Sequence, residues 1–377
     1  MIENNKIDSV MEVKKDNIKA YAIYFEQSFE KLSKKIMELG SRTRKVCIVC
    51  DTNVASIYKK EVEERLLPVC KKIVSYTFMA GEEHKNLETV KNLYRFLIDE
   101  KFDRKDLLIA LGGGVTGDLT GFAAATYLRG IDFIQIPTTL LAQVDSSIGG
   151  KTGVDFDSYK NMVGAFHQPK MVYINISTLK TLSNEQFYCG MGEVLKHGLI
   201  RSSSYYEWII NHMTEICDRE TEILMEMVKK SCDIKRNVVE KDPLEKGERA
   251  LLNFGHTLGH SIEKLMNFQW LHGQCIALGY VMASYISWKR NLLSEEEFFE
   301  IRDMNVGFEL PISFSGLKTE EILAATKVDK KMENGTLKFI LLNGIGNAFI
   351  DRTVTDKEIL DAINYFNIDL MATEENR

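Results

Sequence analysis

Residues 106–118 read DLLIALGGGVTGD, and this stretch decides the fold class. Residues 106–111 predict a strand with an apolar core, which is typical of strands buried inside a parallel sheet. Gly112, Gly114 and Gly117 follow the strand and precede a helical pattern. Glycines in this setting let the backbone approach a pyrophosphate at the start of a helix. The stretch therefore indicates a dinucleotide site, whereas the glycines alone would also fit an ordinary tight turn.

Short apolar strands alternate with amphipathic helices on both sides of this stretch. We expect strands at residues 45–50 and 133–136 and a helix at 86–100, where apolar side chains recur at three-to-four spacing. Such alternation predicts a mostly parallel sheet that is covered by helices.

After about residue 182 helical patterns dominate. A helix is predicted to start near Ser183, and longer patterns follow at 205–217, 220–239, 256–266, 273–289 and 294–305. The fold class is therefore expected to be α/β, with an N-terminal Rossmann-like NAD-binding domain over residues 1–182. A C-terminal all-α domain is expected over residues 183–377. The active site is expected in the cleft between the two domains.

The composition is that of a globular enzyme, because 45% of the 377 residues are hydrophobic and 27% are charged. A net charge of −6 argues against nonspecific binding to nucleic acid. Since apolar runs fall short of the ~18 residues that a membrane helix needs, no membrane association is expected. The polar N-terminal residues do not resemble a secretory signal. We therefore expect a cytoplasmic protein.

The seven cysteines are scattered along the chain. Cys47 and Cys50 form a C-x-x-C pattern, but they stand in an apolar strand, where positions three apart face opposite sides. Buried thiols are therefore favoured over a redox or zinc pair. Reduced thiols also fit a cytoplasmic protein.

Glu193, His256 and His272 form a candidate metal site, although they are far apart in the sequence. One carboxylate and two imidazoles with an open position are typical of a catalytic zinc-type site. Asn253, His256 and His260 stand at i, i+3 and i+7 of one predicted helix and should share a face. Structural histidines are an equally good interpretation of this spacing.

Five cations stand in apolar or small-residue settings: Lys151, Lys160, Lys196, Lys235 and Arg249. A glycine-flanked lysine such as Lys151 suits close approach to an anion, so the group indicates a substrate with phosphate and carboxylate groups. The other interpretation is a set of surface charges on long stems.

Two polar positions leave alternatives open. Asp51 ends a predicted strand, where it could contact a ligand or cap the next helix. Residues 81–85, GEEHK, precede a predicted helix and could either cap it or contact a ribose.

Five sequence blocks together resemble the 3-dehydroquinate synthase family. They are GGGVTGD at 112–118, QIPTTLLAQVDSSIGGKTG at 135–153, KN at 160–161, LNFGHTLGH at 252–260 and LHG at 271–273. The resemblance spans about residues 51–346. It implies an NAD-binding α/β domain followed by a helical domain, bound NAD, and one divalent metal, zinc or cobalt. It also implies a small phosphorylated keto-acid substrate and a homodimer.

The resemblance assigns roles to particular residues. The implied metal ligands are Glu193, His256 and His272. The implied NAD contacts are Asp51, Asn53, Glu82, Lys85, Gly114, Val115, Thr116, Gly117, Asp118, Thr138, Thr139, Lys151, Lys160, Thr178 and Thr181. The implied substrate contacts are Arg129, Asp145, Lys151, Asn161, Lys196, Lys235, Arg249, Asn253, His260 and Lys330. The implied catalytic residues are Glu245, His260, Lys151, Arg129 and Asp145, with proton transfer assigned to Glu245 and His260.

The implied reaction converts 3-deoxy-arabino-heptulosonate 7-phosphate into 3-dehydroquinate and phosphate, a step of the shikimate pathway. NAD⁺ transiently oxidises an alcohol, phosphate leaves by β-elimination, NADH returns the hydride, and an intramolecular aldol reaction closes the ring. Lys151, Lys196 and Asn161 would hold the phosphate, while Lys235 and Arg249 would hold the carboxylate.

Three other functions are open alternatives. Another sugar-phosphate cyclase, such as 2-deoxy-scyllo-inosose synthase, would act on a substrate without a carboxylate and would not need Lys235 and Arg249. A polyol dehydrogenase of the glycerol dehydrogenase type would release NADH. A noncatalytic NAD-binding protein would be expected to lack some of the polar site residues, which are Glu193, His256, His272, Lys151 and His260.

The sequence departs from the family pattern at two positions. Asp155 stands where asparagine is common, and Gln274 stands where glutamate commonly follows His-Gly. Neither position carries a role in the implied set. Residues 1–17 have no counterpart that we can assign.

Overall fold

The computed structural model describes residues 9–157, 159–267, 269–332 and 338–370, without the side chains of 328–332. The chain forms two compact units. The first contains Met1–Leu182 and Leu224–Arg236, and the second contains Ser183–Ile223 and Asn237–Arg377. The segment Leu224–Arg236 lies beyond residue 182 in the sequence but packs with the first unit.

The first unit is built on a seven-stranded sheet with the order β1-β2-β9-β6-β5-β3-β4. β1 pairs antiparallel with β2, and all other neighbours in this sheet are parallel. The strands are β1 (Val10–Lys15), β2 (Ile18–Glu26), β3 (Lys45–Asp51), β4 (Lys72–Phe78), β5 (Leu107–Gly112), β6 (Asp132–Pro137) and β9 (Met171–Asn175). The strands predicted at 45–50, 106–111 and 133–136 are confirmed as β3, β5 and β6.

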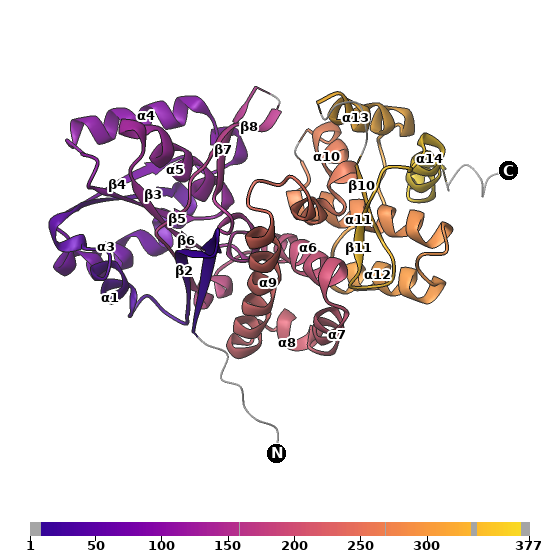
Figure 1. Cartoon of the computed structure of the whole chain (residues 1–377), viewed down its shortest axis with the longest axis horizontal. Helices are drawn as coiled ribbons and strands as arrows, with labels where there is room; N and C mark the ends of the chain where they lie inside the picture. The colour runs from indigo at the N-terminus through magenta and orange to yellow at the C-terminus, as the bar shows by residue number, and fades with distance from the viewer. Residues whose placement is uncertain (1–8, 158, 268, 333–337, 371–377) are drawn as a thin grey trace, which may run out of the picture. The chain divides into compact units, whose positions relative to one another are not determined.

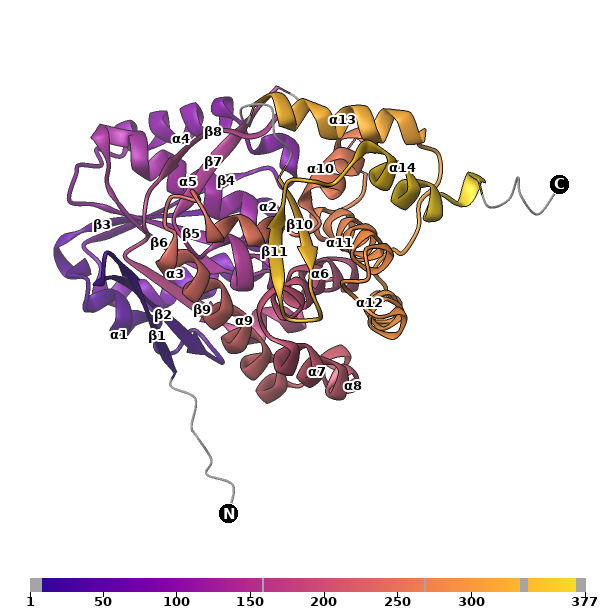
Figure 2. The ribbon, with the colours of Figure 1, turned by 45° about the vertical axis from the view of Figure 1, so that its right-hand side comes forward.

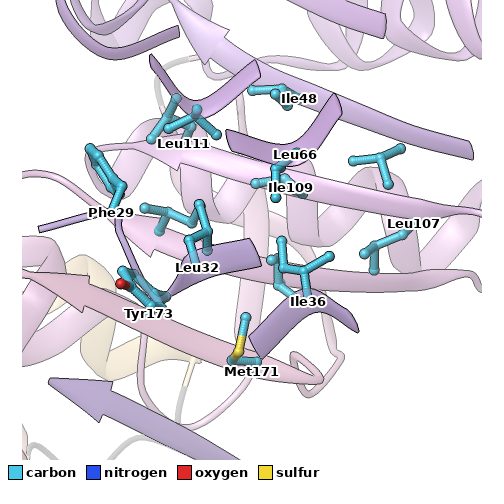
Figure 3. Packing of buried hydrophobic residues seen from close by; sticks show 14 of the residues in the cluster. Phe29, Leu32, Ile36, Ile48, Leu66, Leu107, Ile109, Leu111, Met171 and Tyr173 are labelled. Atoms are coloured by element: carbon cyan, nitrogen blue, oxygen red, sulfur yellow. The ribbon is translucent and has the colours of Figure 1, made fainter. Parts of the chain in front are cut away.

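Helices cover both faces of this sheet (Figure 1). α1 (Leu32–Met37) and α3 (Lys60–Leu66) pack on one face, and α4 (Leu87–Asp99) and α5 (Gly114–Thr126) pack on the other. Figure 3 shows the first of these two cores, where Leu32 and Ile36 of α1 meet Ile109 of β5. The predicted mostly parallel sheet between helical layers is thereby confirmed.

Cys47 and Cys50 lie on opposite faces of β3, as predicted. Cys47 belongs to the core under α4 and α5, and Cys50 belongs to the core under α1 and α3. Both are buried free thiols, and burial raises the pKa of each. They are therefore packing residues of the two cores.

Two features of the first unit were not predicted from the sequence. Residues 10–15, which we could not assign, form the edge strand β1. β7 (Lys151–Phe156) and β8 (Tyr159–Phe166) form a separate antiparallel hairpin that packs against α5. Short connecting helices complete the unit: η1 (Ser41–Thr43), α2 (Thr52–Val54), η2 (Ala55–Lys59), η3 (Leu67–Val69), η4 (Glu82–His84), η5 (Tyr127–Arg129), η6 (Ala142–Ser146) and η7 (Ile176–Lys180).

The second unit is largely helical, as predicted. Its elements are α6 (Asn184–Arg201), α7 (Ser203–Asn211), α8 (Met213–Cys217), η8 (Glu248–Asn253), α10 (His256–Leu265), α11 (His272–Lys289), α12 (Glu295–Gly307), α13 (Thr319–Met332) and α14 (Asp356–Tyr365), while α9 (Thr221–Lys241) belongs to both units. α11 lies at the centre of this unit, because nearly all its side chains from Gly273 to Ser287 are buried.

The second unit differs from the prediction in two places. An antiparallel hairpin of β10 (Phe339–Leu342) and β11 (Ala348–Asp351) packs beside α11, so the unit is not entirely helical (Figure 2). The helix predicted at 205–217 is broken into α7 and α8, because His212 leaves the helical conformation. Across the described residues, no helix is both long and apolar enough to cross a membrane.

Candidate active site

Three histidines and one glutamate converge in the second unit. α6 carries Glu193, and α10 and α11 begin at His256 and His272. Ring nitrogens of His256, His260 and His272 lie within 4.8 Å of one another. Glu193 Oε1 lies 4.0 Å from His256 Nε2 and 3.8 Å from His272 Nε2. The structure thus brings together residues that are up to 79 positions apart in the sequence (272 − 193 = 79).

The donor set and its surroundings fit a divalent metal. Glu193 is fully buried, and among the described residues neither of its carboxylate oxygens has a hydrogen-bond donor, although Lys196 forms an ion pair with it. Burial, reinforced by the charge of Lys196, holds the pKa of His256 well below its ordinary value, so the ring is neutral. A buried carboxylate beside imidazole side chains is the chemistry that zinc and cobalt sites use.

The outer nitrogens of two histidines have partners that orient the rings. His256 Nδ1 lies 3.2 Å from the carbonyl oxygen of Phe254, and His272 Nδ1 lies 3.5 Å from Glu263 Oε2. Such partners fix the tautomer of a histidine and leave Nε2 available as a ligand atom. Glu263 is buried and was not predicted as a site residue. Its signal was available, because it stands seven residues after His256 on the same helix face.

Glycines allow the metal-site helices to approach closely. A Cβ atom on Gly192 would lie 2.6 Å from the carbonyl oxygen of Gly273, and one on Gly273 would lie 1.9 Å from that of Cys189. Both distances are far below a normal contact, so only glycine permits this approach of α6 to the start of α11. The approach brings Glu193 beside His272.

Asn253 does not share a helix with the histidines, and this prediction was wrong. It ends η8, and Gly255, with φ +81°, turns the chain before α10 begins at His256. His256 and His260 do share α10. The spacing of the polar residues suggested one continuous helix, but the positive φ of Gly255 separates η8 from α10.

The loop before η8 holds three predicted site residues together. The Asp242 carboxylate accepts backbone N–H groups from Lys246, Gly247 and Arg249 at 2.9, 2.7 and 3.1 Å. Arg249 is buried and donates to the carbonyl oxygen of Pro243 at 2.7 Å. Asn253 in turn donates to Glu245 at 2.9 Å.

In the first unit, predicted cofactor residues meet at the carboxyl ends of three adjacent strands, β3, β5 and β6. Asp51 Oδ1 accepts the N–H groups of Asn53 and Val54 at 2.9 and 3.0 Å, so it caps α2. Its other oxygen lies 3.3 Å from the hydroxyl of Thr116, at the first turn of α5. Both interpretations of Asp51 are therefore compatible with its position, since it caps a helix and also faces the glycine turn.

The glycine turn runs from the end of β5 into α5. A Cβ atom on Gly112 would lie 2.4 Å from Thr116 Oγ1, and one on Gly117 would lie 2.7 Å from Gln135 Oε1. Gly112 therefore needs to be glycine, because a Cβ there would also lie 2.7 Å from Thr116 Cβ, whereas at Gly117 the nearest atom is the end of the flexible Gln135 side chain. Eight of the other predicted cofactor positions lie in this turn (Gly114, Val115, Thr116 and Gly117), after β6 (Thr138 and Thr139) and around η7 (Thr178 and Thr181).

Lys85 is buried and lies at the centre of a polar cluster beside the glycine turn. Its ammonium lies 2.7 Å from Asp118, 2.6 Å from the side-chain oxygen of Asn161 and 3.9 Å from Glu82. Burial acts to lower the pKa of Lys85, but Asp118 and Glu82 outweigh it and raise that pKa. Lys160 joins the cluster through Glu82, at 3.5 Å.

Three other predicted substrate residues, Lys235, Lys151 and Arg129, do not belong to the cluster around Lys85. Lys235 donates to the carbonyl oxygen of Asp145 at 2.8 Å and also pairs with its carboxylate. Lys151 is exposed at the first position of β7. Arg129 lies beyond the C-terminal end of α5, whereas the glycine turn lies at its N-terminal end. The 13 residues of α5 separate them by about 20 Å, so the structure does not bring Arg129 to the turn.

Lys330 lies in α13, but its side chain is outside the described part of the structure.

Gln274 accepts the N–H of Leu271 at 2.8 Å and so stabilises the start of α11 beside His272. A glutamate at this position could accept the same hydrogen bond. Gln274 therefore preserves the structural role of the glutamate that is common in the family.

Comparison with known proteins identifies the family. The N-terminal model of 3-dehydroquinate synthase matches residues 75–189, and the C-terminal model matches residues 190–332. A 3-dehydroquinate synthase of Acetivibrio thermocellus is 41% identical over 345 residues, which cover 92% of this chain and 96% of that protein. The chain belongs to the 3-dehydroquinate synthase family. The resemblance that the sequence blocks indicated is thereby confirmed.

Solved structures share the fold of this 3-dehydroquinate synthase family member. A 2-epi-5-epi-valiolone synthase from Streptomyces hygroscopicus with NAD⁺ and Zn²⁺ has a TM-score of 0.84 at 24% identity, covering 96% of this chain and 100% of that chain. A 2-deoxy-scyllo-inosose synthase with carbaglucose-6-phosphate, NAD⁺ and Co²⁺ also has a TM-score of 0.84 at 24% identity, covering 94% and 99%. At this identity the likeness concerns the fold.

Proposed function

We propose that this chain converts 3-deoxy-arabino-heptulosonate 7-phosphate into 3-dehydroquinate and phosphate. The observation that carries the proposal is the buried Glu193 carboxylate facing the imidazoles of His256 and His272. The family relatives of about 41% identity support the choice of reaction. A homodimer and a cytoplasmic location belong to the same proposal.

Glu193, His256 and His272 hold one zinc or cobalt ion in this proposal, and the turn at Gly114–Asp118 holds NAD. When bound, NAD supplies reversible hydride transfer and the metal supplies polarisation of an alcohol oxygen. Lys85 and Lys160, whose charges are paired with Asp118 and Glu82, contribute hydrogen-bond donors to NAD beside the turn.

His260 moves a proton at the substrate hydroxyl nearest the metal site. Its ring nitrogen lies within 4.8 Å of nitrogens of His256 and His272, so it can serve a group that those two residues hold. Glu245, oriented by Asn253, is the second proton-transfer group. Lys196 contributes a positive charge beside Glu193 and binds the substrate phosphate with Lys151 and Asn161.

Arg249 and Lys235 bind the substrate carboxylate. Arg249 is preorganised for this, because its guanidinium already bonds Pro243 and its backbone bonds Asp242. Lys235 pairs with Asp145 when no substrate is bound, and it would have to replace these contacts with contacts to the substrate carboxylate. Arg129 and Lys330 are part of the proposal only through the family resemblance.

The test is phosphate release from 3-deoxy-arabino-heptulosonate 7-phosphate with catalytic amounts of NAD⁺ and zinc, while NADH absorbance is followed. We expect phosphate without net NADH, and loss of the reaction with a chelator. An absence of phosphate release from this substrate would contradict the proposal and favour another sugar-phosphate cyclase. NADH accumulation with simple polyols would favour a dehydrogenase.

A further inference from the structure

Asp155 closes a ring of three residues beside the glycine turn, although the proposed function does not use it. The Asp155 N–H donates to the carbonyl oxygen of Lys85 at 2.8 Å. The Lys85 ammonium donates to the side-chain oxygen of Asn161 at 2.6 Å, and the Asn161 N–H donates to the Asp155 carboxylate at 2.7 Å. Within the ring each residue donates one hydrogen bond and accepts one.

The backbone of Asn161 is in a conformation that needs support. Its φ of +54° is in the left-handed region, although it lies within strand β8. Asparagine tolerates this region better than most residues, but the conformation persists only where neighbours hold it. The hairpin is also irregular here, since its register shifts between Val154 and Phe156. The bond to Asp155 supplies a local anchor for Asn161.

The acceptor oxygen of Asp155, rather than its charge, carries this role. The positive charge of Lys85 already has a close counter-ion in Asp118, at 2.7 Å, and a second carboxylate in Glu82, at 3.9 Å. The contact that Asp155 makes with Asn161 is to a neutral N–H group. An asparagine side chain has an acceptor oxygen at the same position, so it could make the same bond.

We propose that Asp155 is a positioning residue whose carboxylate oxygen holds Asn161 in its left-handed conformation, so that the Asn161 side chain meets the Lys85 ammonium. The consequence for catalysis rests on the proposed function, which gives Asn161 a role in binding the substrate phosphate. The effect on the backbone of the β7–β8 hairpin does not depend on the proposed function.

The test compares Asp155→Ala, which removes the acceptor, with Asp155→Asn, which keeps it. Asp157→Asn is the matched control, because it removes an exposed carboxylate from the same hairpin at a position where asparagine tolerates the φ of +53°. Two quantities are measured: kcat and KM for phosphate release, and amide hydrogen exchange of residues 151–166 in the protein without substrate.

For Asp155→Ala we expect KM to rise about fivefold with a smaller change in kcat, which corresponds to the loss of one solvent-exposed hydrogen bond. Amide exchange near Asn161 should also become faster. Asp155→Asn and Asp157→Asn should stay within about twofold of the wild type in both measurements, because each keeps the acceptor that faces Asn161.

An Asp155→Ala protein with unchanged KM and unchanged exchange would overturn the proposal. So would an Asp155→Asn protein that is as impaired as Asp155→Ala. If the wild type releases no phosphate, the proposed function fails, and hydrogen exchange alone still decides the role of Asp155. If Asp155→Ala does not fold, Asp155→Ser takes its place, since its shorter side chain should not reach the Asn161 N–H.

Discussion

At the scale of single residues, the proposed metal site depends on the groups that contact its proposed ligands. Glu193 is an unsolvated carboxylate, and the two flanking imidazoles each have a partner for Nδ1. Burial favours neutral imidazoles, which are the form that binds metal. Glu263 is the partner of His272 Nδ1. We expect it to orient the His272 ring and not to bind the metal itself.

Glu263→Gln should weaken zinc binding about 10- to 100-fold, because an amide is a weaker acceptor for the His272 ring. The measurement is zinc affinity by competition with a chelator of known strength. His272→Ala should abolish stoichiometric zinc, whereas Glu300→Gln, on the exposed face of α12, should leave affinity unchanged. Unaltered affinity in Glu263→Gln would show that the contact does not orient His272.

At the scale of elements, the contact between α10 and α11 depends on glycines. Gly255 precedes α10 with φ +81°, and a Cβ there would lie 2.6 Å from the carbonyl oxygen of Ile276 and 2.7 Å from the N–H of Tyr280. A Cβ on Gly279 of α11 would lie 2.0 Å from the carbonyl oxygen of Gly255. The two helices therefore pack backbone to backbone, and this contact places His256 and His260 beside α11.

Gly255→Ala should be strongly destabilising, since it adds a steric clash to an unfavourable backbone conformation. Gly40 is the matched control, because its φ of +75° is similar and a Cβ there would meet nothing within 4 Å. Gly40→Ala should cost about 1–2 kcal/mol for the left-handed conformation alone. Gly255→Ala should cost about 1–3 kcal/mol more, from overpacking. Equal melting temperatures for the two variants would contradict the packing argument.

Beyond single elements, Arg290 ties the C-terminal elements of the second unit together. From the end of α11 it bonds both carboxylate oxygens of Glu358, at 2.6 and 2.8 Å, and Asp351 at 3.1 Å. It also bonds the hydroxyl of Thr353 at 3.1 Å. One guanidinium thus joins α11, the end of β11 and the first turn of α14, which is the geometry that makes an ion pair stabilising.

This contact predicts a pH dependence of stability. The hydrogen bonds from Arg290 lower the pKa of Glu358 from 4.5 to about 2. Because the folded-state pKa is the lower one, the stabilisation is complete above about pH 4.5 and is lost as the pH falls toward about 2. Glu358→Gln should therefore be less stable than the wild type by about 1 kcal/mol at pH 7, and the difference should narrow between pH 4.5 and pH 3.

Urea unfolding of both proteins at several pH values measures this difference. Glu64→Gln is the control, because Glu64 is exposed and lies 3.9 Å from Lys60, where a surface pair contributes little. A stability difference for Glu358→Gln that stays constant from pH 7 to pH 3 would contradict the assignment.

On the scale of the whole molecule, the sequence by itself determined the fold class and the family. Local sequence patterns predicted both halves of the fold. The spacing of apolar residues distinguishes a strand from a helix, and this applies to the strand, turn and helix at residues 106–118 and to the helices after residue 182. The hairpin of β7 and β8 was missed because glycines and polar residues interrupt any such period. The break at Gly255 was missed because its positive φ and its close packing against Ile276 and Tyr280 appear only in the folded structure.

Only the tertiary structure decided which distant side chains meet. Glu263 lies behind His272, Lys235 is paired with Asp145, and Asp155 joins Lys85 to Asn161. Sequence spacing places Glu263 on the helix face of His256 but does not pair it with His272, and it carries no information on the other two contacts, because they depend on how helices and strands pack. The residue types of the site were therefore readable from the sequence, whereas the partners that orient them were not.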